Sequence, residues 1–249
     1  MGLVIVAIVV FGLVWWQRAN PKGVQESVAS SVSSIPTNVA SPDSITASNA
    51  FEMARFAAWV TNQTDVDELL GLGGRLLQEG RVGMGFLCFH RVTDLKPENE
   101  EAWFNIGVAL VRLGELPEAE YAYRRAISNF TEYAEARNNL GNLLARQKRY
   151  AEATEQFNTV IEQTPDNATA HNNLGRVLAE QGNALAALQR FTEAARLDTN
   201  YLEARFNLGS AHLSMGQTNE AVASFRETLK LRPDFQPALK ALAKLGKTP

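Results

Sequence analysis

The sequence contains a single cysteine, Cys88, among its 249 residues. One cysteine excludes an internal disulfide, and the absence of a second cysteine nearby excludes a CxxC motif. We therefore interpret Cys88 as part of the helix packing. With no further cysteine, the sequence does not indicate the redox compartment in which the protein works.

An excess of basic residues is also lacking. Lys and Arg number 24 against 27 Asp and Glu, which gives a formal net charge of -3 at pH 7. A surface that binds nucleic acid needs basic side chains to neutralise phosphates. We therefore expect no nucleic acid as a partner.

No catalytic constellation is present in the sequence. His90, His171 and His212 are scattered along the chain, and we interpret each as a packing or surface residue. The glycine-rich residues 71–74 lack the GK[ST] signature and the preceding strand of a phosphate-binding loop. We expect no enzyme, no metal, no cofactor and no small-molecule substrate.

What the sequence does contain is a 34-residue repeat. Its first column is always glycine: Gly73, Gly107, Gly141, Gly175 and Gly209. Twelve residues later a second column is small: Gly85, Ala119, Ala153, Ala187 and Ala221. Four residues further a third column is aromatic: Phe89, Tyr123, Phe157, Phe191 and Phe225. The columns define five units, 66–99, 100–133, 134–167, 168–201 and 202–235, and we number positions from 1 within each unit.

Each column has a physical reason. Positions 8 and 20 are small because two antiparallel helices of one unit cross there, and the large residue at position 24 fills the remaining gap. Proline at position 32 (Pro97, Pro165, Pro233) ends the second helix. Glycine at position 15 (Gly80, Gly114, Gly182, Gly216) ends the first helix in a left-handed conformation. Lys148 replaces that glycine in the third unit, so we expect this turn to close differently.

This pattern resembles the tetratricopeptide repeat family over about two-thirds of the chain. The second unit follows the family's W-L-G-Y-A-F-A order with Trp103, Ile106, Gly107, Leu110, Ala119, Tyr123 and Ala126. The resemblance implies an all-α fold, a right-handed α-solenoid of five helix-turn-helix units. We expect a leading capping helix over 50–65, which begins after a Ser48 cap, and a C-terminal capping helix over 236–249, where Lys240 and Lys244 supply a polar outer face.

Residues 1–18 form an apolar segment, and no charged side chain precedes Arg18. Seventeen helical residues reach about 25 Å, close to a bilayer core of about 30 Å, and Trp15 and Trp16 suit the membrane interface. We predict a retained single-pass anchor, with a cleaved signal segment or a misplaced start as the competing interpretations. Arg18 and Lys22 favour a cytosolic array, whereas the Ser/Pro-rich linker at 19–49 resembles an exported stalk. The side of the membrane stays open.

Position 6 carries the candidate binding residues. It reads Asn105, Asn139, Asn173 and Asn207 in four consecutive units, with Asn138, Asn142 and Asn172 as neighbours. An amide offers two donors and two acceptor lone pairs, so it can bind the backbone of an extended peptide. In the resembling family, positions 2, 5, 6, 9, 12 and 13 face a concave groove. Phe104, Phe206 and Arg176 would contribute apolar and positive contacts there, although the asparagines could instead bond the next helix.

The predicted function is that of a membrane-tethered scaffold that binds a protein or peptide in its groove. Two alternatives remain open at this stage. The protein could be an assembly subunit that uses its convex face, or an accessory repeat protein of an enzyme.

Overall fold

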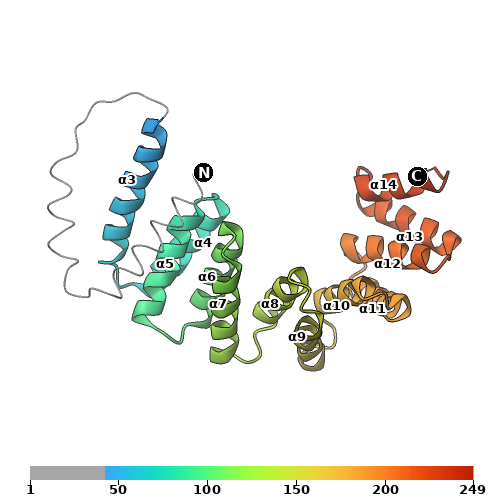
Figure 1. Cartoon of the computed structure of the whole chain (residues 1–249), viewed down its shortest axis with the longest axis horizontal. Helices are drawn as coiled ribbons and strands as arrows, with labels where there is room; N and C mark the ends of the chain where they lie inside the picture. Colours follow the sequence, from blue (N-terminus) through green and yellow to red (C-terminus); the bar gives the residue numbers. More distant parts are fainter. Residues whose placement is uncertain (1–42, 249) are drawn as a thin grey trace. The chain divides into compact units, whose positions relative to one another are not determined.

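The computed structural model describes residues 43–248, and within them the chain forms helices α3 to α14 and no strand (Figure 1). The chain divides into two compact units, one ending at Asn129 and the other beginning at Phe130. We describe each unit by itself. The all-α prediction is confirmed.

The described part of the N-terminal unit begins with a long helix and continues with two helix pairs. These are α3 (Asp43–Val60), α4 (Val66–Gln78), α5 (Val82–Leu95), α6 (Glu100–Leu113) and α7 (Leu116–Asn129). Side-chain caps begin the first helix of each pair: Asp65 accepts from the Glu68 amide at 3.0 Å, and Asn99 accepts from the Ala102 amide at 2.7 Å.

The C-terminal unit contains three helix pairs and a final short helix. They are α8 (Ala134–Arg146), α9 (Tyr150–Gln163), α10 (Ala168–Glu180), α11 (Ala184–Leu197), α12 (Leu202–Ser214), α13 (Thr218–Leu231) and α14 (Gln236–Lys244). The second helix of every pair ends two residues before position 32, whether that residue is Pro165 or Thr199. Proline is therefore compatible with this boundary but is not required for it.

The glycine column and the aromatic column meet inside each helix pair. A Cβ built on Gly73, Gly107, Gly141, Gly175 or Gly209 would lie between 2.5 and 2.7 Å from the ring at position 24 of the same pair. Phe89, Phe157 and Phe225 are at most 1% exposed. The small residue at position 8 thus makes room for one buried aromatic ring, which packs directly against the first helix of its pair.

The turn of the third unit differs from the prediction. Lys148 has a φ of 62°, in the left-handed region where the other four units have glycine. The Lys148 amide donates to Ala145 and the Arg149 amide donates to Leu144 at 2.9 Å, the same bonds that close the glycine turns. The turn therefore closes in the same way, because these backbone bonds fix the conformation even without glycine.

The N-terminal boundary of the leading helix is another correction. We expected a linker up to residue 49 and a helix from 50, whereas α3 begins at Asp43 and includes Ser48. No glycine or proline occurs between Pro42 and Val60, so nothing in the sequence interrupts the helix there. The helix packs against α5, and Val60 at its end is 2% exposed.

The last helix covers the end of the C-terminal unit. Ala238 and Leu242 of α14 are fully buried in one cluster with Val222, Phe225 and Leu229 of α13. None of the helices between 43 and 248 is long and apolar enough to cross a bilayer. The predicted anchor at 1–18 and most of the predicted linker lie outside the described residues.

Candidate functional site

Two asparagines join neighbouring repeats in the C-terminal unit. The Asn207 amide of α12 donates to Asn172 Oδ1 of α10 at 2.9 Å. Asn172 in turn donates to the Tyr201 hydroxyl at 3.3 Å and is 3% exposed. This pair therefore holds α10 and α12 together, as the alternative interpretation of the asparagine column required.

The equivalent pair one repeat earlier is Asn138 of α8 and Asn173 of α10, separated by the same 35 residues. Their side chains are 7% and 5% exposed. Among the described residues, Asn138 Oδ1 and Asn173 Nδ2 are buried without a hydrogen-bond partner. One is an acceptor and the other a donor, the same two kinds of group that Asn172 and Asn207 join one repeat later.

Burial changes the expectation for Asn138, Asn172 and Asn173. We expected these side chains to face a groove, but they are buried, and α10 contacts both α8 and α12. Position and spacing alone could not reveal this, because a groove residue and an interhelical residue have the same 34-residue period.

The other predicted contacts remain at least partly accessible. Asn139 and Asn142 of α8 are half-buried, and Arg176 of α10 is exposed. In the N-terminal unit, Asn105 is half-buried and donates to the Glu101 carbonyl of its own helix at 2.9 Å. Phe104 of the same helix is half-buried, with its ring 6.1 Å from that of Tyr123.

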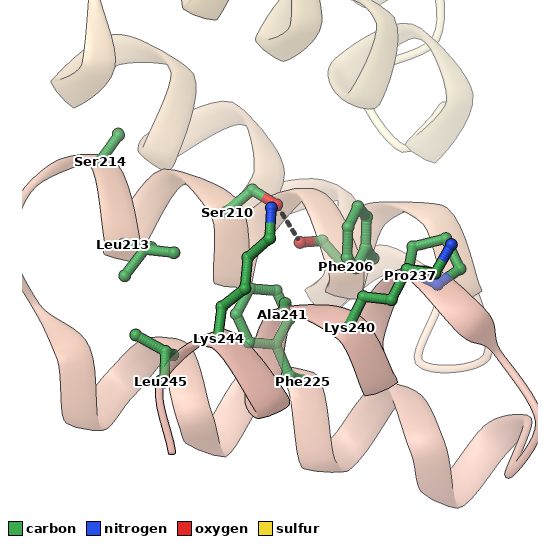
Figure 2. A pocket seen from close by; sticks show the side chains of 10 residues that line it. All are labelled: Phe206, Ser210, Leu213, Ser214, Phe225, Pro237, Lys240, Ala241, Lys244 and Leu245. Atoms are coloured by element: carbon green, nitrogen blue, oxygen red, sulfur yellow. Dashed lines mark hydrogen bonds between the residues drawn. The ribbon is translucent and has the colours of Figure 1, made fainter. Parts of the chain in front are cut away.

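A pocket of about 430 Å³ lies between α12 and α14, with α13 beneath it. Phe206 lies at one side, with its ring 5.5 Å from the rings of Phe225 and Phe235. Figure 2 shows the side chains that line it: Phe206, Ser210, Leu213, Ser214, Phe225, Pro237, Lys240, Ala241, Lys244 and Leu245.

The lining follows the repeat numbering. Phe206, Ser210, Leu213 and Ser214 are positions 5, 9, 12 and 13 of the fifth unit. If the numbering is continued from Gln236, then Pro237, Lys240, Ala241 and Lys244 are positions 2, 5, 6 and 9. Eight of the ten lining residues thus occupy the positions that we assigned to the binding face. The sequence assigned Lys240 and Lys244 only to the polar outer face of a capping helix, whereas the repeat numbering, continued onto α14, places them on the binding face.

The cysteine and two of the histidines are held in local packing or hydrogen-bond contacts. Cys88 is fully buried, and this burial raises the pKa of its thiol to about 12. His171 lies 3.0 Å from the Pro165 carbonyl, and His212 lies 2.7 Å from the Gln217 side chain. Both histidines thus contact the backbone or side chain of a turn next to their own helix.

Sequence models of known repeat families match three stretches of the chain. Models described as "Tetratricopeptide repeat" match residues 87–134 and 166–234, and one described as "TPR repeat" matches 141–182. This chain is a tetratricopeptide repeat protein. The prediction of that family is therefore confirmed.

Solved tetratricopeptide repeat structures resemble the chain at low identity. YrrB, described as a TPR protein with an unusual peptide-binding site, is 19% identical over 75% of this chain and 96% of its own, with a TM-score of 0.57. PilF of Pseudomonas aeruginosa is 21% identical over 73% of this chain and 82% of its own, with a TM-score of 0.67. MamA of Desulfovibrio magneticus RS-1 is 18% identical over 68% and 96%, with a TM-score of 0.60. No curated protein matches the chain. These likenesses establish the fold alone.

Proposed function

We propose that this protein is a non-catalytic scaffold that binds an extended segment of another protein along the first-helix face of its C-terminal unit. The observation that carries the proposal is the pocket between α12 and α14, because eight of its ten lining residues fall on positions 2, 5, 6, 9, 12 and 13. Tetratricopeptide repeat proteins are generally scaffolds, and YrrB, which has this fold, is described as having an unusual peptide-binding site.

The polar contacts in this proposal come from the accessible side chains. Asn139 and Asn142 lie three residues apart on α8, so they share a helix face and can each bond a peptide group. Arg176 of α10 occupies the same repeat position as Asn142 and can bind a carboxylate or a backbone carbonyl. Asn138, Asn172 and Asn173 support the face from behind, because they are buried between its helices.

Membrane tethering is part of the same proposal. The apolar residues 1–18 would anchor the chain as a single pass, and the segment that follows would let the repeats reach partners near the bilayer. Either side of the membrane is compatible with this arrangement.

The test is selection of binding peptides from a random display library on the full chain, followed by affinity measurements on variants. The variant Asn139→Ala/Asn142→Ala/Arg176→Ala should bind a selected peptide at least about tenfold more weakly, since it removes several hydrogen bonds of about 1 kcal/mol each. A control variant, Glu162→Ala/Gln189→Ala, changes exposed residues of the second helices α9 and α11 and should keep the affinity.

The reverse result would contradict the proposal. If the control variant lost the peptide and the α8/α10 variant kept it, the protein would act through the opposite surface, as an assembly subunit would. Melting curves of both variants should match that of the parent chain, because none of the changed side chains is fully buried.

A further inference from the structure

We propose that the pocket between α12 and α14 accepts a large apolar side chain of the bound segment, and that Lys240 and Lys244 bind acidic residues next to that side chain. This inference rests on the proposed function, since it takes the occupant to be a polypeptide. It adds the chemical class of the partner sequence.

The apolar part of the site is its floor and walls. Phe225 forms the floor and is 1% exposed, so it is fixed by the packing of the fifth repeat. Phe206, Leu213, Ala241 and Leu245 line the sides, and Leu213 is 37% exposed. A volume of about 430 Å³ lies within the range of small-molecule pockets and is ample for one aromatic or branched side chain.

The hydroxyl groups of the pocket leave this apolar character intact. Ser210 donates to the Phe206 carbonyl at 3.0 Å, and Ser214 donates to the Ala211 carbonyl at 2.8 Å. Both hydroxyl hydrogens are thus directed at the backbone of α12. A bound apolar group would not have to displace water from an unpaired donor there.

The charged part of the site comes from α14 alone. Lys240 and Lys244 are four residues apart, so they lie on one face of the helix, and Figure 2 shows both extending from α14 on the side of the pocket. No acidic residue lines the pocket, and within residues 43–248 neither lysine forms an ion pair. Like charges at this spacing repel each other, and an anion placed between them would relieve the repulsion.

A third lysine of the same unit, Lys230, has an acidic partner. Lys230 of α13 donates to Glu227 at 2.6 Å, and this contact lowers the pKa of the Glu227 carboxyl. Its positive charge is compensated within its own helix, whereas those of Lys240 and Lys244 are directed at the pocket without an acidic partner. The charge pattern therefore favours an acidic occupant over a basic or neutral one.

The occupant is a protein segment because the pocket occupies the binding-face positions of the repeats. Ser210 of the pocket stands at the position that Asn142 and Arg176 hold in the two preceding repeats. A chain bound along α8, α10 and α12 would therefore meet the pocket at its α14 end. The proposed sequence is a Phe or Leu followed by two Asp or Glu residues.

The experiment uses the full chain and a short synthetic peptide, acetyl-Gly-Phe-Glu-Glu-Gly-amide, with the matched Gly-Phe-Gln-Gln-Gly peptide as a control. Binding is followed by methyl NMR of Leu213, Ala241 and Leu245, which line the pocket. We expect shifts at these three residues, an affinity at least about tenfold higher for the acidic peptide, and weaker binding as salt is raised. Equal binding of the two peptides, or no shift with either, would overturn the proposal.

Two variants locate the interaction. Lys240→Gln/Lys244→Gln should lower the affinity for the acidic peptide at least about tenfold, while Lys230→Gln/Lys247→Gln removes the same charge elsewhere and should not. Ser210→Leu should block the pocket while both lysines remain. Circular dichroism confirms folding of each variant. Equal losses of affinity in the two double-lysine variants would indicate a general charge effect and would contradict the assignment of the site to Lys240 and Lys244.

A failure of this inference can be told apart from a failure of the proposed function. The short peptide spans only the pocket, so Asn139→Ala/Asn142→Ala/Arg176→Ala should bind it normally. If library-selected peptides bind in an Asn139-, Asn142- and Arg176-dependent way while the Phe-Glu-Glu peptide causes no shift, the pocket assignment alone is wrong. If vesicles of equal phosphatidylglycerol and phosphatidylcholine shift the same methyl groups and the peptide does not, the occupant is a lipid and the proposal is overturned.

Discussion

Lys148 interrupts the glycine column at position 15, but its backbone has the same left-handed conformation as those glycines. Its φ of 62° is in the left-handed region, which costs a residue with a Cβ about 1 kcal/mol or more. The turn tolerates this free-energy cost because the hydrogen bonds that close the helix end require a left-handed residue at this position.

Replacing Lys148 by glycine should therefore stabilise the protein by about 0.5–1 kcal/mol, which chemical denaturation monitored by circular dichroism can measure. The matched reverse change is Gly182→Lys. Gly182 has a φ of 79° and open space around a built Cβ, so only backbone strain should act, and we expect a loss of about 1 kcal/mol. A Lys148→Gly variant less stable than its parent would show that the lysine side chain makes a contribution larger than the strain.

Contacts within one repeat could be predicted from the sequence, whereas contacts between repeats could not. Gly141 and Phe157 could be paired from the sequence, because both are fixed by one contact inside one repeat. Asn172 and Asn207 could not, because their bond joins two repeats and depends on how deeply each side chain is covered. Period and residue type predict which position a residue has, but not whether its neighbour buries it.

Helix α4 contains two adjacent glycines whose surroundings are opposite. A Cβ built on Gly73 would lie 2.7 Å from the Phe89 ring, whereas one built on Gly74 meets nothing within 4 Å. Alanine at the first site overpacks the α4/α5 contact, and alanine at the second only improves helix propensity.

We expect Gly74→Ala to stabilise the N-terminal unit by about 0.5–1 kcal/mol and Gly73→Ala to destabilise it by about 1–3 kcal/mol. Urea unfolding of the two single variants measures both effects. Stabilisation by both changes would mean that the Phe89 ring moves freely, contrary to its 1% exposure, and destabilisation by both would contradict the open space at Gly74.

At the scale of elements, the boundaries inside the repeats followed from the sequence better than those at the ends. Helices α4 to α13 are bounded by repeating turn residues, so their limits recur five times. The start of α3 has no such repetition, and the search for a serine cap placed it seven residues too late. The final helix α14 could be predicted from its apolar spacing, but its place beside a pocket depends on how it packs against α12 and α13, which no repeated turn residue indicates.

On the scale of the whole molecule, the spectroscopic probes are unequally distributed. Cys88 and the described tryptophans Trp59 and Trp103 all precede residue 130, and residues 130–249 contain neither residue type. Burial raises the pKa of the Cys88 thiol to about 12, so at pH 8 the native protein has far less reactive thiolate than an exposed cysteine would. Labelling of Cys88 by a thiol reagent therefore reports opening of the N-terminal unit.

This distribution allows a test of coupling between the two units. Gly209→Ala should destabilise the C-terminal unit, because a Cβ there would lie 2.7 Å from the Phe225 ring. In repeat proteins stability is a sum of local and nearest-neighbour contributions. We therefore expect the variant to shift the urea midpoint seen by circular dichroism but leave those of tryptophan fluorescence and Cys88 labelling nearly unchanged. Equal shifts of all three midpoints would mean that the chain unfolds as one cooperative body.

Phe225 has two roles: its ring fills the space left by Gly209 and it also forms the floor of the α12/α14 pocket. Selection for folding would therefore conserve the floor residue Phe225. The rim residues Ser210, Lys240 and Lys244 do not fill the space beside Gly209, so selection for folding would not constrain them in this way. Over evolutionary time this pocket could change the partners it accepts by altering its rim alone, while the architecture beneath it stayed the same.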